Sequence, residues 1–422
     1  MTEMNWPALY AGRAERMKAS EIRELLKLLD QPDVVSFAGG IPDPALFPAE
    51  AVRAAFAEAL RDGAAAQALQ YSVSEGYRPL REWIAGHMAR LGVACDADNV
   101  LITSGSQQGL EFLAKLLLSA GDTALVTAPT YLGALQAFAA YEPRYDPLSL
   151  EGRNATPAAF RQMAAAAGSR IKLAYVVPDF QNPTGETVGR QARERLLDLA
   201  AELDIAVIED AAYQALRFEG EPVPPVLALD IARSGSIEAA RTVYCGSFSK
   251  TVAPALRVGW ICAAKALIEK LVLVKQASDL HSATVNQIVM HRVAESVHAE
   301  QVSRARAVYR ARRDAMLEAL ARFMPPGVSW TRPEGGMFVW LTLPDGIDTE
   351  ALLGRAVREA RIAFVPGRAF FADAAVTNTL RLSYSLASPE QIETGIARLG
   401  RLVADAGRRS APVQAASAGA LS

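Results

Sequence analysis

The chain has 422 residues, and its 44 Lys and Arg nearly balance its 46 Asp and Glu, so the formal net charge is −2. This length allows about two or three domains, and a hydrophobic content of 51% excludes wholesale disorder. The near-neutral balance argues against a nucleic-acid partner, which usually requires a basic excess.

The cysteines and histidines are few and widely spaced. Cys95, Cys245 and Cys262 form no CxxC pair, which argues against a disulfide framework and fits a reducing compartment. The four histidines lack a metal-ligand spacing such as HExxH, so we expect no metal site. The N-terminus does not read as a signal peptide, and proline and glycine interrupt the longest uncharged stretch, residues 123–141. We therefore expect a soluble, cytoplasmic protein with no membrane partner.

In the middle of the chain, short apolar runs alternate with longer helical patterns. Six runs are predicted strands, at residues 99–103, 123–127, 172–177, 205–208, 242–245 and 257–262. Predicted helices lie between most of them, for example at 107–119 and 190–203. This alternation indicates βαβ units and a mostly parallel sheet with both faces covered.

After about residue 290 the pattern changes and indicates a second, smaller α+β domain. A long Arg-rich helix at 301–323 comes first, and a helix at 389–403 comes last. Between them lie three predicted strands, at residues 337–343, 362–365 and 379–384. From about Gly407 the chain is rich in Ala, Ser and Gly, and we expect a disordered tail.

Polar segments follow four of the predicted strands, at the strand ends where ligands bind in open α/β sheets. Residues 103–109 (TSGSQQG) form a small-residue turn that opens a helix, which is either an anion site or an ordinary capped turn. Asn182 begins the tight turn Asn-Pro-Thr-Gly, which would hold its amide at the sheet edge or serve only as a turn. Asp210, three residues before Tyr213, is either a buried carboxylate with a partner or a helix N-cap.

The fourth segment contains Lys250, one of only eight lysines in the chain. The lysine shortage itself is best explained by genome base composition, and most lysines are solvated surface charges. Lys250, however, follows a strand and lies between Ser247, Ser249 and Arg257. Hydroxyls and a guanidinium together suit a dianionic phosphate.

Taken together, these segments bring a phosphate anchor, a buried acid, an amide, a phenol and an amine to one crevice. This combination suits pyridoxal phosphate (PLP). The Lys250 amine would form a Schiff base with the aldehyde. Asp210 would keep the pyridine nitrogen protonated so that the ring accepts electrons. Asn182 and Tyr213 would hydrogen-bond the phenolate oxygen of the ring.

From about residue 19 to 403 the chain resembles the PLP-dependent class I/II aminotransferases of fold type I, and within them the α-aminoadipate/kynurenine branch. The motifs that carry this resemblance are SFAGGIP at 36–42, QY at 70–71, EGY at 75–77, SGSQ at 104–107, NPTG at 182–185, Asp210 with Tyr213, SFSK at 247–250, Arg257, GGMF at 335–338 and RLSY at 381–384. The resemblance implies an α/β fold with a mostly parallel seven-stranded sheet between helices, a smaller α+β domain, and an obligate homodimer with shared active sites.

The resemblance also implies residue roles. Lys250 would carry the cofactor and move a proton between the substrate Cα and the cofactor, with a lowered pKa. Tyr131 would stack on the pyridine ring, Arg381 would clamp the substrate α-carboxylate with help from Asn182, and Tyr71 would reach the phosphate of the neighbouring subunit. The phosphate shell would be Ser106, Gln107, Ser247, Ser249 and Arg257.

Several of these residues also have a purely structural interpretation. Tyr131 could be core packing, Arg381 a surface arginine on a strand, and Tyr71 an aromatic at the start of a helix. Gly39 and Gly40 could be turn residues, although paired glycines also allow the backbone to approach a substrate closely.

Residues 19–28 resemble the mobile helix of the aminoadipate branch, in which an arginine at the position of Arg23 meets the distal carboxylate of the substrate. Arg23 could instead be a solvated arginine on an amphipathic helix. Arg23 in the site would favour acidic substrates such as 2-aminoadipate, glutamate and 2-oxoglutarate, and a helix that swings away would also admit apolar or aromatic side chains.

The sequence departs from the family pattern at two positions. Ala211 replaces a second acid that often follows the one matching Asp210, which leaves the pyridine contact intact. Ala255 replaces a glycine after Pro254, and if that glycine takes a positive φ, the direction of Arg257 is in doubt.

Three functions compete: an aminotransferase with a ping-pong reaction between an L-amino acid and a 2-oxo acid, another PLP enzyme of this fold such as a β-lyase, racemase or decarboxylase, and a PLP-binding regulator domain. The segment before Phe37 is too short and not basic enough for the DNA-binding domain that a regulator needs. We divide the chain into an N-terminal arm and substrate lid at 1–45, a large PLP-binding domain at 46–290, a small domain at 291–406 and a disordered tail at 407–422.

Overall fold

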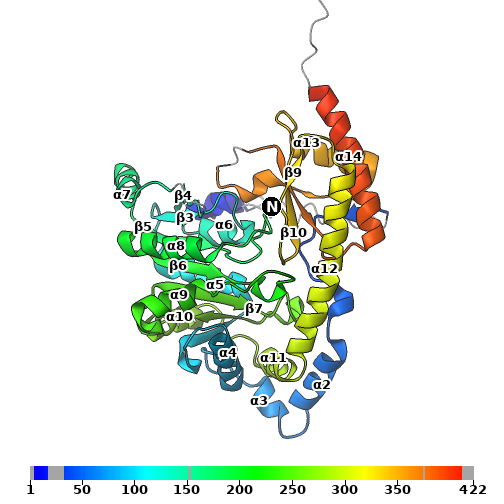
Figure 1. Ribbon diagram of the computed structural model, residues 1–422. Coiled ribbons are helices and arrows are strands. Elements are labelled where there is room, and N and C mark those ends of the chain that lie inside the picture. The colour runs from blue at the N-terminus through cyan, green and yellow to red at the C-terminus, as the bar shows by residue number, and fades with distance from the viewer. Residues whose placement is uncertain (1–3, 18–32, 151–153, 374–375, 411–422) are drawn as a thin grey trace, which may run out of the picture.

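The computed structural model describes residues 4–17, 33–150, 154–373 and 376–410. A large sheet with helices on both faces forms one part, and a smaller sheet lies against two long helices in the other (Figure 1).

The large sheet has seven strands. In spatial order these are β2 (Val100–Thr103), β8 (Gly259–Cys262), β7 (Thr242–Ser247), β6 (Ala206–Asp210), β5 (Ile171–Val176), β3 (Thr123–Val126) and β4 (Arg144–Pro147). Strand β8 is antiparallel to both of its neighbours, and all other adjacent pairs are parallel. The predicted mostly parallel, seven-stranded sheet is therefore confirmed. Strand β4 was not predicted, because its sequence RYDP is charged and contains proline, as edge strands tolerate.

Helices cover both faces of this sheet because its strands are apolar on both sides. Along β5, Leu173 and Tyr175 belong to the same hydrophobic cluster as helix α5, whereas Ala174 and Val176 pack with helix α8. The first face carries α5 (Ser106–Leu117), α6 (Leu132–Ala139) and α10 (Lys265–Gln276). The opposite face carries α4 (Arg78–Arg90), α7 (Pro157–Ala166), α8 (Arg190–Leu203), α9 (Val226–Ser234) and α11 (Thr284–Ser296).

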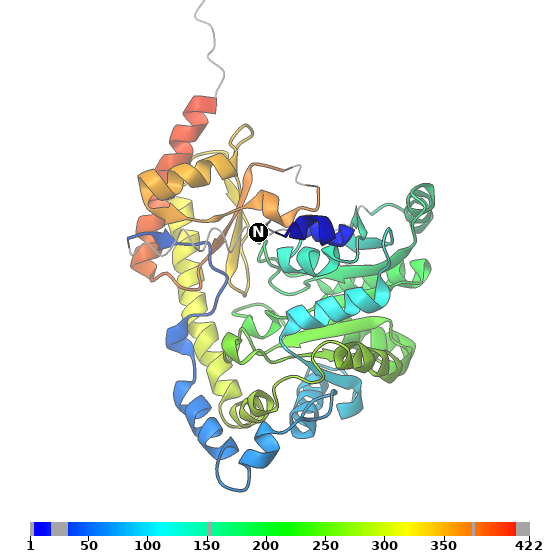
Figure 2. The ribbon, with the colours of Figure 1, turned by 180° about the vertical axis from the view of Figure 1, so that it is seen from behind.

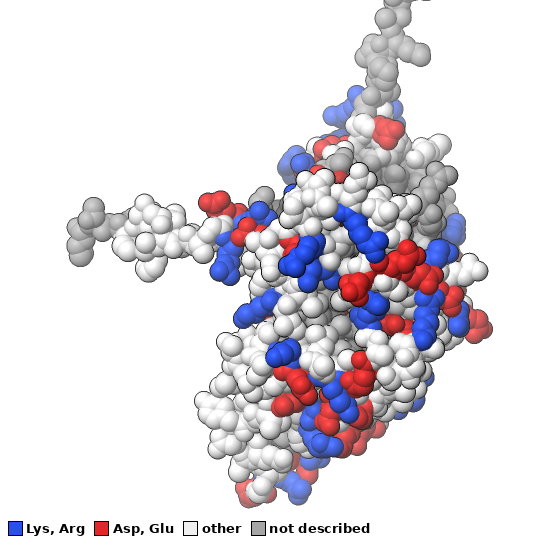
Figure 3. All heavy atoms as spheres, turned by 90° about the vertical axis from the view of Figure 1, so that its left-hand side faces the viewer, with Lys and Arg blue, Asp and Glu red and all other residues white. Residues whose placement is uncertain are grey.

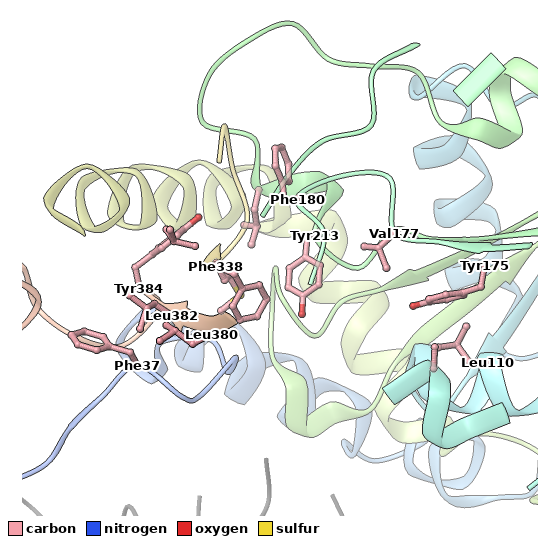
Figure 4. Close-up of a cluster of buried hydrophobic side chains, with 14 of the residues drawn as sticks. Phe37, Leu110, Tyr175, Val177, Phe180, Tyr213, Phe338, Leu380, Leu382 and Tyr384 are labelled. Atoms are coloured by element: carbon pink, nitrogen blue, oxygen red, sulfur yellow. The ribbon is translucent and has the colours of Figure 1, made fainter. Parts of the chain in front are cut away.

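The smaller part is built on a four-stranded sheet in the order β12 (Val365–Pro366), β13 (Thr379–Ser383), β10 (Phe338–Thr342) and β9 (Ser329–Trp330). Helices α12 (His298–Phe323) and α14 (Pro389–Ser410) pack against each other beside it, and α13 (Thr349–Arg355) lies close to β12. Strand β1 (Val35–Ser36) pairs in parallel with β11 (Ile362–Ala363), so the N-terminal segment joins this part of the molecule. One hydrophobic cluster continues from here to the large sheet, with Phe37 and Leu382 at one end and Tyr175 at the other (Figure 4).

Two expected boundaries meet helices in the structure. The boundary at 290/291 falls inside α11, so the chain passes between the two parts without a loop at that point. Helix α14 continues to Ser410, past Gly407, so the tail was predicted to begin too early; residues 411–422 lie outside the described residues. The division into domains otherwise stays a prediction.

The remaining helices and the N-terminal segment lie at the periphery. Helices α2 (Ala49–Ala59) and α3 (Ala65–Leu69) both pack against α11. Residues 4–17 run along the back of the view in Figure 1 and face the viewer in Figure 2. Arg16 in this segment forms an ion pair with Glu142 at 3.5 Å.

One face of the molecule carries charges of both signs. On the face shown in Figure 3, Lys and Arg lie among Asp and Glu and do not gather into one basic area. Within the described residues, no helix is long and apolar enough to cross a membrane. The same residues contain no group of three His, Cys, Asp or Glu side chains placed to hold a metal ion.

Candidate active site

A pocket of about 160 Å³ lies at the carboxyl ends of β5, β6 and β7. This is the edge at which parallel sheets bind ligands. Most of the residues predicted for the site line this pocket, although the sequence places them far apart. The lining residues are Ser106, Gln107, Tyr131, Val177, Asp210, Ala212, Tyr213, Ser247, Ser249, Lys250, Pro254 and Arg257.

Lys250 follows β7 and reaches across the pocket to the N-terminal segment. Its Nζ atom donates a hydrogen bond to the Gly40 carbonyl oxygen at 2.9 Å. Burial lowers the pKa of this amine to about 8, and the positive charges of Arg381 and Arg257 act in the same direction. A neutral amine, which can act as a nucleophile or accept a proton, is therefore accessible near neutral pH.

Asp210 ends strand β6 and is almost completely buried. Its Oδ2 atom accepts a hydrogen bond from the Tyr175 hydroxyl at 2.9 Å, while its buried Oδ1 atom has no partner within the described chain. Burial raises the pKa of this carboxyl to about 6, against the lowering effect of the Tyr175 hydrogen bond. Sequence reasoning missed Tyr175, and the available signal was a hydroxyl in the buried, C-terminal part of β5.

The neighbouring acid, Glu209, performs the capping role that we considered for Asp210. The two carboxylate oxygens of Glu209 accept hydrogen bonds from the backbone N–H groups of Val226 and Leu227, at 2.8 and 2.9 Å, at the start of α9. The short helix that follows Asp210, Gln214–Leu216, has Tyr213 and not Asp210 at its N-cap position, so the structure gives no support to the N-cap interpretation of Asp210.

Arg381, Asn182 and Tyr213 form a connected group beside the pocket. Arg381 Nη1 donates to Asn182 Oδ1 at 2.7 Å, and Asn182 Nδ2 donates to the Tyr213 hydroxyl at 3.4 Å. Arg381 Nη2 donates to the Ala38 carbonyl oxygen at 2.7 Å, which leaves its buried Nε without a partner in the described chain. Burial lowers the pKa of Arg381 to about 10.

The interpretation of Arg381 as a surface residue is wrong, since its side chain is only 1% exposed. Its guanidinium lies over the ring of Phe338, 4.3 Å from the centroid, and 5.1 Å from that of Phe370. Phe338 in turn lies edge-on to Tyr213, with ring centroids 5.6 Å apart (Figure 4). Sequence reasoning placed Phe338 in the GGMF motif without giving it a role.

On the other side of the pocket, hydroxyls and N–H groups converge with Arg257. Ser106 and Gln107 begin α5, whose first turn has N–H groups without helical partners. Ser249 accepts a hydrogen bond from Arg257 Nη1 at 3.5 Å and another from the Ser247 hydroxyl at 2.9 Å. The side chain of Gln107 is occupied elsewhere, because its Nε2 donates to the Gly133 carbonyl oxygen at 2.7 Å.

The concern about Ala255 is resolved by the backbone. Ala255 lies in a short 3₁₀ turn, Pro254–Leu256, and Arg257 itself takes the left-handed conformation with φ 52°. Arg257 Nη2 donates to the Ser104 carbonyl oxygen at 3.1 Å, so its guanidinium is held despite the missing glycine. Gly105 must be glycine, because its φ is +83° and a Cβ there would lie 2.1 Å from Arg257 Nη2.

Four further predicted residues have different outcomes. Tyr131 lines the pocket at the start of α6 and is half-buried, and burial raises its pKa to about 12. Gly40 contacts the site through its carbonyl oxygen. Tyr71 is 78% exposed in the loop between α3 and α4, so it does not start a helix, and it is not among the residues that line the pocket. Arg23 lies outside the described residues.

The residues present fit PLP. The unpartnered Asp210 Oδ1 at the pocket wall suits a protonated ring nitrogen, and the serine hydroxyls, the α5 N-terminus and Arg257 suit a phosphate. The amine of Lys250 lines the same pocket and can bind an aldehyde. A seven-stranded sheet with this site at its carboxyl edge defines the class of PLP-dependent enzymes of fold type I.

Comparison with known proteins identifies the family. Residues 32–399 match the family model "Aminotransferase class I and II", and the chain belongs to this family. It is 43% identical over 405 residues to aromatic-amino-acid aminotransferase 1 of Thermococcus litoralis, with 95% of each chain covered. It is also 43% identical over 401 residues to 2-aminoadipate transaminase of Thermus thermophilus, covering 95% of this chain and 98% of the other.

The solved structures agree with this identification. The crystal structure of LysN, an α-aminoadipate aminotransferase from Thermus thermophilus complexed with N-(5'-phosphopyridoxyl)-L-leucine, superposes with a TM-score of 0.85 at 40% identity, over 96% of this chain and 100% of that one. The protein is therefore a transaminase that transfers amino groups with PLP as its cofactor.

Proposed function

We propose that this transaminase exchanges amino groups between a 2-oxo acid such as 2-oxoglutarate and an L-amino acid that is either 2-aminoadipate-like or aromatic or aliphatic. The observation that carries the proposal is the buried guanidinium of Arg381, which is held by Asn182 beside Lys250 and has a free Nε atom. A desolvated arginine of this kind suits the α-carboxylate that every amino acid and 2-oxo acid carries. The similar proteins named for 2-aminoadipate and for aromatic amino acids support this range of side chains.

We assign the cofactor contacts by chemistry. Asp210 would pair with the ring nitrogen, Asn182 and Tyr213 would bind the phenolate oxygen, and Tyr131 would lie against the ring. The phosphate cup, as we name it, would consist of Ser106, Gln107, Ser247, Ser249 and Arg257. Gln107 would contribute its backbone N–H, since its side chain already binds Gly133.

When bound, PLP supplies an electron-accepting ring for the electron pair left at the substrate Cα. The chain itself would position the substrate and move the proton. Arg381 and Asn182 would fix the α-carboxylate, and the lowered pKa of Lys250 lets its amine accept the Cα proton and return it to another carbon. Gly40 and Phe338 would exclude water above this amine.

We also propose that the working unit is a homodimer that shares its active sites. Large apolar side chains are exposed at the end of α3, after α3 and between α10 and α11, with exposed fractions of 71% for Leu69, 57% for Val73 and 53% for Leu280. Tyr71 lies near them, and its ring is edge-on to that of His281, with the centroids 5.9 Å apart. A second copy of the chain that covers this surface would bring Tyr71 to the phosphate of the partner's site.

A cytoplasmic location is a further proposal. All three cysteines are free, and two of them are buried, which fits a reducing compartment. The division into a lid, a large and a small domain is likewise proposed, supported by the pairing of β1 with β11 and by the separate smaller sheet.

The Lys250→Ala variant tests the proposed function. It should lose turnover and the visible absorbance of lysine-bound cofactor, because no other amine lines the pocket described here. Lys270→Ala, an exposed lysine on α10, is the matched control and should retain both. Turnover and absorbance that survive in the Lys250 variant would refute the assignment.

A further inference from the structure

One charged side chain close to the phosphate cup has no place in the mechanism above. Lys275, on the last turn of α10, is the only lysine among the described residues whose side chain is completely buried. It lies where α10 packs against α5, the helix whose N-terminus faces the pocket. A buried ion pair can often be replaced by apolar residues without loss of stability. We therefore ask which groups the buried ammonium of Lys275 holds in place.

The ammonium of Lys275 is fully engaged. Its Nζ atom donates to both carboxylate oxygens of Asp279, at 3.0 and 3.1 Å, to Gln108 Oε1 at 3.0 Å and to Ser282 Oγ at 3.0 Å. Gln108 Nε2 donates to Asp279 Oδ2 at 2.8 Å, which closes the ring of contacts. The orientations of the Gln108 amide and the Ser282 hydroxyl are therefore fixed by one charge.

Two paths lead from this charge to Ser104. The same Gln108 Oε1 that binds Lys275 accepts a hydrogen bond from the Ser104 backbone N–H at 2.8 Å. Ser282 Oγ, the second acceptor of Lys275, lies 3.3 Å from Ser104 Oγ. One buried lysine thus acts on the backbone and the side chain of the same residue.

Ser104 connects the two sides of the phosphate cup, Arg257 and the start of α5. Its carbonyl oxygen accepts the 3.1 Å hydrogen bond from Arg257 Nη2, and Gly105 and Ser106 follow it directly into the pocket. The space is tight, since a Cβ on Gly259 would lie 2.7 Å from the Ser106 nitrogen. A rotation of the Ser104 peptide would therefore move both Arg257 and the α5 N-terminus.

We infer that Lys275 is a positioning residue for the phosphate cup, acting through Gln108 and Ser282 on Ser104. The inference rests on the proposed role of the cup. It makes the specific claim that Lys275 strengthens binding of the phosphate of PLP and leaves binding of the ring unaffected.

The test compares two probes on the cofactor-free protein: PLP, and pyridoxal, which lacks the phosphate. Lys275→Met should raise the Kd for PLP by about tenfold, which corresponds to one misplaced charge-assisted hydrogen bond between the cup and the phosphate. The Kd for pyridoxal should stay within about twofold. Lys270→Met on the same helix is the control and should change neither value. Equal changes for both probes, or no change for PLP, would overturn the inference.

Gln108→Met provides a second variant that leaves Lys275 paired with Asp279 and Ser282. It should raise the Kd for PLP in the same selective way, by about threefold. It should add little when combined with Lys275→Met, because the loss of Lys275 already disturbs the contact between Gln108 and Ser104. If the effects of Gln108→Met and Lys275→Met on the Kd for PLP simply add, Lys275 does not act through Gln108. If Lys275→Met does not fold, the Gln108→Met variant decides alone. Absence of a selective loss of PLP binding in that variant would then overturn the inference.

Arg257→Leu separates this inference from the proposed function. If Arg257→Leu weakens the binding of PLP but not of pyridoxal, and Lys275→Met does not, the assignment of the phosphate cup is supported and the role of Lys275 is refuted. If neither variant distinguishes PLP from pyridoxal, the cup itself is misassigned, and the inference falls with it.

Discussion

The Nζ atom of Lys250 and the carbonyl oxygen of Gly40 are 2.9 Å apart, although 210 positions separate the two residues in the chain. This contact joins the amine that lines the pocket to the N-terminal segment. The segment is anchored on its other side, where Ser385 Oγ donates to the Ile41 carbonyl oxygen at 2.7 Å and Arg312 pairs with Asp43 at 2.6 Å. The reactive amine is therefore positioned by both parts of the molecule.

Gly40→Ala should lower kcat/KM by about tenfold, a barrier increase typical of overpacking. The new Cβ would lie 2.8 Å from Cζ of Phe338, so the ring beneath Arg381 must move. Steady-state kinetics with an amino acid and 2-oxoglutarate measure the effect. Gly86→Ala, where nothing lies within 4 Å of the added Cβ, is the control. Equal activities of the two variants would contradict a close approach at Gly40.

Asp210→Asn should raise the stability of the cofactor-free protein and lower the catalytic activity. In the cofactor-free protein burial raises the pKa of Asp210 from 3.8 to about 6, so the folded state binds the proton more tightly than the unfolded chain. The free energy of unfolding therefore falls as pH rises from 3.8 to about 6 and stays reduced above that. The variant should be more stable than the wild type at neutral pH, by up to about 3 kcal/mol, and this gain should vanish toward pH 3.8.

The same variant should lose at least about a hundredfold in kcat/KM, because an amide cannot pair with a positively charged ring nitrogen. Urea unfolding of the cofactor-free protein at several pH values measures the stability, with the exposed Asp62→Asn as the control. A variant that is no more stable at neutral pH would show that Asp210 is not held as an unfavourable buried charge.

Much of this site could be predicted from the sequence because strand ends, turns and small-residue helix starts are local signals. Helix α8 runs over Arg190–Leu203, the same residues that its pattern predicted. The turn at Asn182 and the lysine after β7 were identified in the same way, since a parallel sheet brings the carboxyl ends of its strands together.

What could not be predicted depends on contacts between distant segments. Nothing in the local sequence around Tyr175 shows that its hydroxyl faces Asp210, because the register of β5 against β6 decides this. The assignment of the helix cap to Glu209 rather than Asp210 likewise depends on which face of β6 meets α9. The replacement of a glycine by Ala255 raised a doubt that only the backbone of Arg257 could settle.

Arg23→Ala should raise KM for 2-aminoadipate more than KM for leucine or phenylalanine. Arg23 lies outside the described residues, so its role as a partner of the distal carboxylate stays a prediction from the resemblance. Removing a charge that meets that carboxylate should affect acidic substrates alone, by about tenfold if the pair is partly desolvated. Amino-donor kinetics with 2-oxoglutarate held at a saturating level measure the difference. Equal changes for all three donors would eliminate the contact.

Tyr71 offers a test of shared active sites. Tyr71→Ala should weaken PLP binding although the side chain is not among those that line the pocket of its own chain. The informative species is a hybrid dimer with one Tyr71→Ala subunit and one Lys250→Ala subunit, purified with two different affinity tags. Its pocket with an intact Lys250 would receive Tyr71 from the partner, whereas the other pocket would lack both groups.

The hybrid should therefore show about half the wild-type activity at limiting PLP, because one of two equivalent sites is complete. Neither parent homodimer should reach this value, since one lacks the amine at both sites and the other lacks Tyr71 at both. If Tyr71 acted within its own chain, the pocket that keeps Lys250 would lack the tyrosine, and the hybrid would need as much PLP as the Tyr71→Ala homodimer. The PLP concentration at half-maximal activity thus distinguishes a tyrosine that crosses the interface from one that does not.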